Sequence, residues 1–127
     1  MGILSAASLH WHNGILHPAY LAVRRRLMEG VRFTALFAIS DNMAIGAMRA
    51  LQEAGQQIPR DCSVIAIDGL TMSEYINPTL TTLCQPMEHM GRRSVEILLD
   101  MVEHRGGPIR ETAHTTLRTG ESVRDIS

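Results

Sequence analysis

Cysteine is scarce in this chain of 127 residues, and the two cysteines present, Cys62 and Cys84, stand far apart in the sequence. A disulfide framework or a structural zinc site needs several cysteines at short spacings, so this content favours neither. It fits a reduced, cytoplasmic setting instead. Lysine is absent, and all twelve basic residues are arginine. Biased codon usage explains this more simply than selection for the guanidinium group.

Long apolar runs are also missing. No stretch approaches the roughly 20 apolar residues that a membrane-spanning helix needs. The N-terminus lacks the basic segment followed by an apolar one that marks a signal peptide. The formal net charge of −1 gives no general attraction to nucleic acid or to an anionic membrane surface. We therefore expect a soluble protein without a membrane partner.

Sequence motifs of enzymes and cofactor-binding proteins are absent as well. The chain has no G-x-G-x-x-G after a strand, no P-loop and no G-x-S-x-G nucleophile elbow. Three histidines near the N-terminus, His10, His12 and His17, match no zinc spacing and have no cysteine or carboxylate close by. We therefore expect no enzymatic activity, no cofactor and no metal site.

What the sequence does contain is an alternation of strands and helices. Continuous apolar runs at 34–39 and 63–67 predict parallel strands buried on both faces. Helical spacing of apolar residues predicts helices over 18–29 and 43–54, and residues 3–9 are compatible with a first strand. A strand, a helix and a strand in this order form a right-handed crossover unit. The predicted fold is a three-layer α/β sandwich with a mainly parallel sheet.

The second half of the chain continues this pattern less regularly. A short helical turn is expected over 72–76, a third strand over 81–85 and a strongly amphipathic helix over 87–103. Residues 111–118 alternate weakly between polar and apolar types, which indicates an edge strand. Beyond Gly120 we expect the terminus to fray.

Polar side chains follow the two central strands at their carboxyl ends. Ser40 and Asp41 come after the first of these strands, and Asp68 comes after the second. Ligands bind at this edge of open α/β sheets. From spacing alone, the simpler interpretation is that Ser40 or Asp41 caps the next helix and that Asp68 tightens a turn. A hydrolase or transferase that uses Ser40 or Asp68 is disfavoured, because no histidine stands directly after either strand end to act as its base.

Four segments of the chain have sequence patterns that occur together, in this order, in one protein family. Residues 34–47 are similar to "TAvfa.ND.mA.Ga", residues 49–68 to "raL.e.G..iP.diSvigfDd", residues 75–86 to "Y..PpLTTv.qp", and residues 90–92 with the helix after them to "mG..a...Ll". On these segments, which span about residues 19–118, the chain resembles the C-terminal part of the effector-binding core of LacI/GalR-type transcription regulators.

The resemblance implies one lobe of a periplasmic-binding-protein-like type I core, in which a small effector, typically a sugar, binds between two lobes. Residues 1–85 would belong to the C-terminal lobe, residues 86–107 would form a helix of the N-terminal lobe, and residues 108–127 would be a return strand and tail. The family's DNA-binding headpiece has no counterpart here. We therefore expect DNA contact only through a headpiece that this chain lacks.

The resemblance also implies roles for individual residues. Asp68 matches the effector-contacting Asp at the end of "SvigfD". Ser40 stands where the family usually has the Asn of "ND", another effector contact, and its hydroxyl is shorter than an amide. Gly69 replaces the common second acid of "DD".

Two surfaces are expected to support a homodimer or a higher oligomer. The first matches the family's dimer interface and is formed by Ile45, Met48, Met72, Tyr75 and Ile76. The second is the apolar side of the helix over 87–103, formed by Val95, Leu98, Leu99 and Val102. The predicted function is effector sensing and dimerisation in a cytoplasmic LacI/GalR-type regulator. The alternative is a fragment of the solute-binding protein of a sugar transporter, which shares the core fold.

Overall fold

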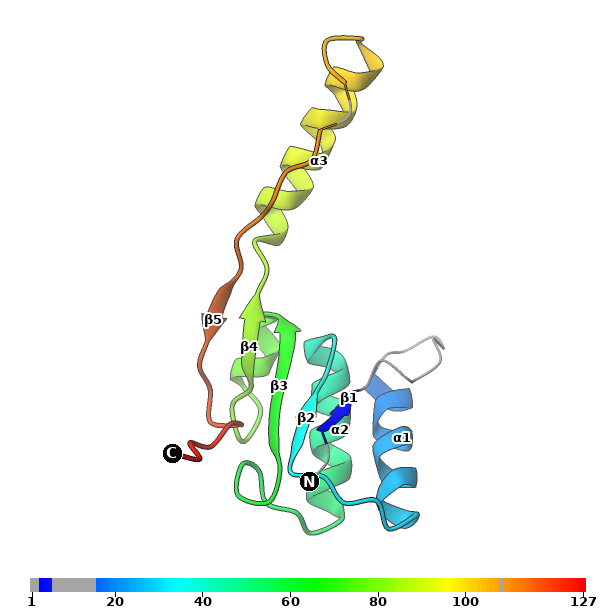
Figure 1. Ribbon diagram of the computed structural model, residues 1–127, viewed down its shortest axis with the longest axis vertical. Coiled ribbons are helices and arrows are strands. Elements are labelled where there is room, and N and C mark those ends of the chain that lie inside the picture. Colours follow the sequence, from blue (N-terminus) through cyan, green and yellow to red (C-terminus); the bar gives the residue numbers. More distant parts are fainter. Residues whose placement is uncertain (1–2, 6–15, 108) are drawn as a thin grey trace. The chain divides into compact units, whose positions relative to one another are not determined.

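A computed structural model describes residues 3–5, 16–107 and 109–127 (Figure 1). Its elements are β1 (Ile3–Ser5), α1 (Leu16–Met28), β2 (Ala35–Phe37), α2 (Asp41–Glu53), β3 (Ser63–Asp68), the 3-10 helix η2 (Thr71–Glu74), β4 (Thr81–Cys84), α3 (Met87–Val102) and β5 (Thr116–Arg118). Their order and type are those predicted from the sequence. Of the first predicted strand only β1 is described, and His10 and His12 lie outside the described residues.

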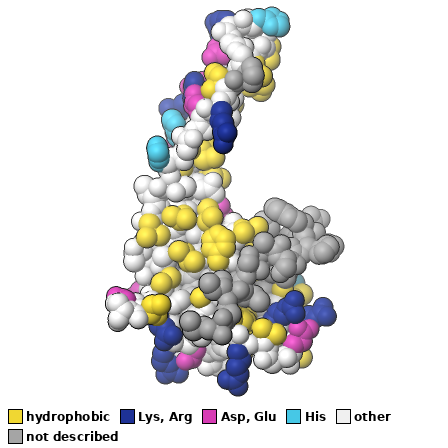
Figure 2. All heavy atoms as spheres, viewed as in Figure 1, with side chains coloured by type: hydrophobic (Ala, Val, Ile, Leu, Met, Phe, Trp, Pro, Cys, Tyr) yellow, Lys and Arg dark blue, Asp and Glu magenta, His cyan; other side chains and the backbone are white. Residues whose placement is uncertain are grey.

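The strands form one sheet in the order β1-β2-β3-β4-β5, and the pairs β1–β2, β2–β3 and β3–β4 are parallel. Residues alternate along β2 and β3: Leu36, Val64 and Ala66 are buried, whereas their neighbours are half-buried. On the face seen in Figure 2, hydrophobic side chains gather over the sheet. The predicted α/β class with a mainly parallel sheet is confirmed.

Helices α1 and α2 pack closely against each other beside the sheet (Figure 1). Their contact depends on Gly46, because a Cβ atom there would lie 2.1 Å from the carbonyl oxygen of Leu16. Small side chains at Ala19, Ala44 and Ala47 are buried along these two helices. The core therefore lies between α1, α2 and the sheet.

The chain divides into two compact units, which we describe separately. The larger unit contains residues 1–84 and 117–127, and the smaller one contains residues 85–116. Within the smaller unit, Arg93 of α3 pairs with Glu111, with a distance of 2.5 Å between guanidinium and carboxylate. Helix α3 buries none of its residues, so its apolar side is exposed to solvent.

The described residues were also compared with the requirements of a membrane-spanning helix and of a metal site. Among the described residues, no helix is both long and apolar enough to cross a bilayer. Within that same part of the chain, no three His, Cys, Asp or Glu side chains come together as metal ligands. His17, the one N-terminal histidine whose position is described, stacks on the Tyr20 ring with 5.9 Å between the ring centroids.

The two cysteines should react with thiol reagents at very different rates. Cys62 is fully buried, and burial raises the pKa of its thiol to about 11. At pH 8 only about one Cys62 in a thousand would then be a thiolate, the reactive form. Cys84 is half-buried at the end of β4. We expect one fast and one slow thiol in a colorimetric assay with an aromatic disulfide. Cys84→Ala should remove the fast phase, and denaturant should make both thiols fast. A fast phase that survives Cys84→Ala would contradict this assignment.

Candidate functional site

Asp68, the predicted effector-binding residue, ends β3 at the carboxyl edge of the sheet. One of its carboxylate oxygens accepts a hydrogen bond from the backbone N–H of Asp41, at 3.4 Å. Its φ angle is 143°, a value that residues other than glycine rarely adopt. The carboxylate is therefore fixed at the N-terminus of α2, where the helix dipole favours a negative charge.

Gly69, which stands at the second acid of the family pattern, lies too close to β4 to carry a side chain. Asp68 pairs with Cys84 of β4, and a Cβ atom at Gly69 would lie 2.6 Å from the Cα, Cβ and Sγ atoms of Cys84. Gly69 also has a φ angle of 79°, in the region that favours glycine. Any side chain at this position would displace the end of β4.

Ser40, the other predicted effector contact, is the N-cap of α2. Its Oγ accepts a hydrogen bond from the backbone N–H of Met43, at 3.2 Å. This is the capping role that spacing alone suggested. The hydroxyl hydrogen remains available as a donor, so capping is compatible with an effector contact, which stays a prediction.

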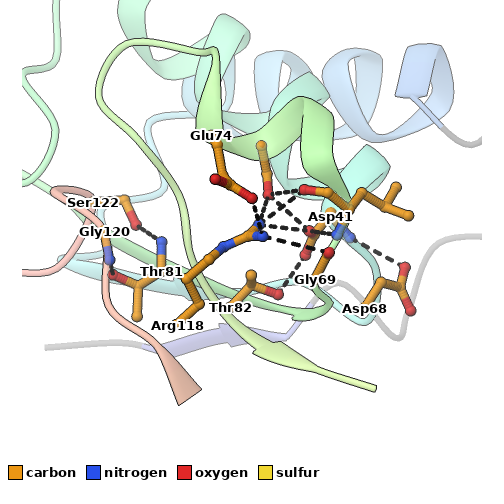
Figure 3. A network of polar contacts seen from close by, with 11 residues as sticks. Asp41, Asp68, Gly69, Glu74, Thr81, Thr82, Arg118, Gly120 and Ser122 are labelled. Carbon is orange, nitrogen blue, oxygen red and sulfur yellow. Dashed lines mark hydrogen bonds and ion pairs between the residues drawn. The ribbon is translucent and has the colours of Figure 1, made fainter. Parts of the chain in front are cut away.

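The sequence left open whether Ser40 or Asp41 caps α2; Ser40 is the cap, and the Asp41 side chain has a different role. Its side chain is fully buried and accepts three hydrogen bonds (Figure 3). One oxygen accepts from the N–H of Leu70 at 2.7 Å and from the hydroxyl of Ser73 at 2.9 Å. The other accepts from the hydroxyl of Thr82 at 2.5 Å. A buried carboxylate with this many donors holds together segments that are distant in the sequence.

Arg118 of β5 lies against the same carboxylate, and sequence reasoning gave it no role. Its guanidinium is 4.0 Å from the Asp41 carboxylate and 2.6 Å from that of Glu74, and it also donates to the hydroxyl of Ser73. Two backbone carbonyls accept from it, that of Leu70 at 2.8 Å and that of Gly69 at 3.4 Å (Figure 3). We call Asp41, Leu70, Ser73, Glu74, Thr82 and Arg118 the Asp41–Arg118 cluster.

The sequence predicts that the chain frays beyond Gly120, but the residues directly after Gly120 are bonded to the sheet. Ser122 is fully buried, and its hydroxyl donates to the carbonyl oxygen of Val64 at 2.5 Å and accepts from the N–H of Thr81 at 2.9 Å. The N–H of Gly120 donates to the Thr81 hydroxyl at 3.0 Å. These bonds fix the segment after β5 against β3 and β4.

The predicted dimer surface is only partly exposed. Met48 is 2% exposed and belongs to the core, so its inclusion in an exposed surface was wrong. Ile76 is half-buried and packs against the same core, and Ile45 is also half-buried. Tyr75 and Met72 are 83% and 61% exposed. Helix α2 packs against both α1 and β3, which accounts for the burial of Met48.

Replacing the buried carboxylate should destabilise the protein strongly. Asp41→Asn removes the negative charge opposite Arg118. It also places an NH₂ donor where a carboxylate oxygen now accepts hydrogen bonds from other donors. Each hydrogen bond to a charged group contributes about 1.5–3 kcal/mol of unfolding free energy, and the substitution weakens several of them at once. Urea denaturation measures this, with Asp100→Asn in α3 as a control that should change stability by no more than about 0.5 kcal/mol. An Asp41→Asn protein as stable as the control would contradict the cluster's role.

Comparisons with known proteins identify the family. The chain matches the periplasmic binding protein-like domain over residues 5–123. It is 38% identical to the HTH-type transcriptional repressor MelR of Bacillus subtilis over 107 residues, which are 84% of this chain and 31% of that protein. It thus spans about a third of the length of this relative.

Two solved structures have a similar fold. The lac repressor dimer bound to operator and the anti-inducer ONPF has a TM-score of 0.78 at 29% identity, over 84% of this chain and 37% of that one. The transcriptional regulator CelR in complex with cellobiose has a TM-score of 0.78 at 30% identity, over 92% of this chain and 38% of that one. The chain therefore belongs to the periplasmic binding protein-like domain family, and the proteins it resembles within that family are LacI-type transcription regulators.

Proposed function

We propose that this chain is the effector-sensing portion of a LacI/GalR-type DNA-binding transcription regulator that works in the cytoplasm. The observation that carries the proposal is the family match over residues 5–123 together with Asp68 at the carboxyl edge of a parallel sheet. That edge is where α/β proteins bind small ligands. Effector binding would change lobe closure and thereby the affinity for DNA.

The effector we propose is a sugar. Sugar hydroxyls donate well to an ionised carboxylate, and charge-assisted hydrogen bonds of this kind are stronger than neutral ones. Asp68 supplies that carboxylate, and Ser40 stands next to the end of the adjacent strand β2. In the proposed assignment, residues 1–85 contribute to one lobe and α3 to the other. We expect weak binding by this chain alone, because one wall of a closed site leaves much of a ligand exposed.

A solute-binding protein of a sugar transporter is the second candidate, since it shares the fold. The names of the relatives favour a regulator: MelR is a transcriptional repressor, and the lac repressor structure contains operator DNA. Because these relatives are regulators, we propose no enzymatic activity for the chain. In the parent protein, DNA contact would come from a headpiece outside this chain.

Sugar binding should depend on Asp68. We expect calorimetry against cellobiose, lactose and ribose to detect weak binding of at least one of these sugars. Asp68→Asn should weaken it at least about tenfold, because a hydrogen bond to a charged group contributes about 1.5–3 kcal/mol. Asp61→Asn is the matched control, since Asp61 precedes β3 at the opposite end of the strand and bonds to the N–H of Gln57. Binding that is as strong in Asp68→Asn as in the wild type would refute the assignment.

We also propose that the chain self-associates, with a second copy covering the apolar side of α3. That side carries Val95, Leu98, Leu99 and Val102, each at least half exposed. Leaving such side chains in water forfeits roughly 1.5–3 kcal/mol of burial for each one. Apolar patches of this kind usually mark an interaction surface. The exposed Tyr75 and Met72 form the other candidate surface, at which the family forms its dimers.

Light scattering at micromolar concentration tests the self-association. We expect a mass at least twice the 14.1 kDa of one chain. Leu98→Glu should shift the mass to that of a monomer, because it places a charge in the middle of the apolar side of α3. His89→Glu adds the same charge on the opposite, charged side of the helix and should leave the mass unchanged. A monomeric wild type with the same mass as Leu98→Glu would end the proposal.

A further inference from the structure

The polypeptide connects the two units twice, after β4 and before β5. Both connecting strands contact the buried Asp41 carboxylate, one through a hydrogen bond and the other through an ion pair. Thr82 of β4 donates to one carboxylate oxygen, and Arg118 of β5 lies 4.0 Å from the other. One buried group therefore contacts the strand on which the chain leaves the larger unit and the strand on which it returns.

The same cluster holds Asp68 from two sides. The backbone N–H of Asp41 donates to the Asp68 carboxylate, and the guanidinium of Arg118 donates to the carbonyl oxygens of Gly69 and Leu70, the two residues that follow. Asp68 itself has a backbone conformation that is unfavourable for a residue with a side chain. Such a conformation persists only when neighbouring groups fix it, and these bonds supply that restraint.

From this arrangement we infer that Arg118 is a positioning residue for Asp68, and that it couples the effector edge to both connections between the units. Arg118 fixes the segment from Gly69 to Glu74, and this segment fixes the direction of the Asp68 carboxylate. A ligand that moves Asp68 moves the acceptors of Arg118, and with them β5. The coupling to an effector rests on the proposed function, whereas the restraint on the segment does not.

The geometry requires arginine rather than any cation. The guanidinium donates to four acceptors, which are two carbonyls, one hydroxyl and the carboxylate of Glu74, and it forms an ion pair with Asp41 at 4.0 Å. Its planar fork carries five N–H donors, whereas a lysine ammonium carries three on a single atom. Arg118→Lys therefore keeps the charge that balances Asp41 but loses most of the contacts with the segment. The Arg118→Lys variant therefore distinguishes a role of Arg118 in positioning the segment from a role in neutralising the charge of Asp41.

The first experiment needs no ligand. Amide hydrogen exchange is compared between wild type, Arg118→Lys and Arg118→Met. The control is Arg49→Met, since among the described residues Arg49 pairs with the exposed Glu53 on its own helix α2. We expect exchange to rise at least tenfold in both residues 69–74 and residues 81–84 in the two Arg118 variants, with α1 unchanged. A rise confined to β5, or an equal rise in every element, would overturn the inference. Arg118→Lys keeps the test valid if Arg118→Met does not fold.

The second experiment uses cellobiose as the probe. In wild type, saturating cellobiose should slow exchange in residues 81–84, and Arg118→Lys should remove this protection while raising the Kd at least tenfold, with Arg49→Met unchanged. Equal Kd values and equal protection in wild type and Arg118→Lys would refute the coupling. If the wild type binds none of the sugars in the calorimetric test, that result counts against the proposed function, and the ligand-free exchange result still decides whether Arg118 restrains the segment.

Discussion

A buried negative charge must be paired, and in this protein that requirement fixes where several elements lie. The carboxylate of Asp41 has no exposure to water, so its hydrogen bonds must come from the chain itself. They come from β4 through Thr82, from the segment around η2 through Leu70 and Ser73, and the balancing charge comes from β5 through Arg118. Removing any one donor would leave a desolvated charge less compensated, so each of these contacts helps to keep its element in place.

The candidate effector edge depends on the same constraint. Asp41 begins α2, and its backbone N–H, left free by the helix geometry, is bonded to Asp68. Next to it, Gly69 permits a close approach to Cys84 that no other residue would allow. The position of the carboxylate that we propose as the ligand contact is thus determined by backbone and buried polar groups rather than by side-chain packing. A polar arrangement of this kind is directional, as recognition of a hydroxylated ligand requires.

Local patterns sufficed to predict most of the elements. Strands β2 and β3 correspond to apolar runs, and α3 corresponds to an amphipathic spacing. Both patterns involve residues that are close in the sequence, so they can be recognised from the sequence alone. The roles of Asp41 and Arg118 could not be predicted from the sequence, because their hydrogen-bond partners are far away along the chain. The same reason accounts for Ser122, whose partners Val64 and Thr81 belong to other strands. An acidic residue in the first turn of a helix looks like a cap whether its partners are local or distant.

The burial of α2 bears on how a signal could leave the effector edge. Helix α2 packs against α1 on one side, where Gly46 contacts the backbone of Leu16, and against the sheet on the other. A helix enclosed on two sides at core density resists small displacements, since each would open cavities or create overlaps. A shift of Asp68 therefore cannot be absorbed by α2. In the coupling that we propose, it is taken up by the segment around η2 and by the short strand β5, which Arg118 connects.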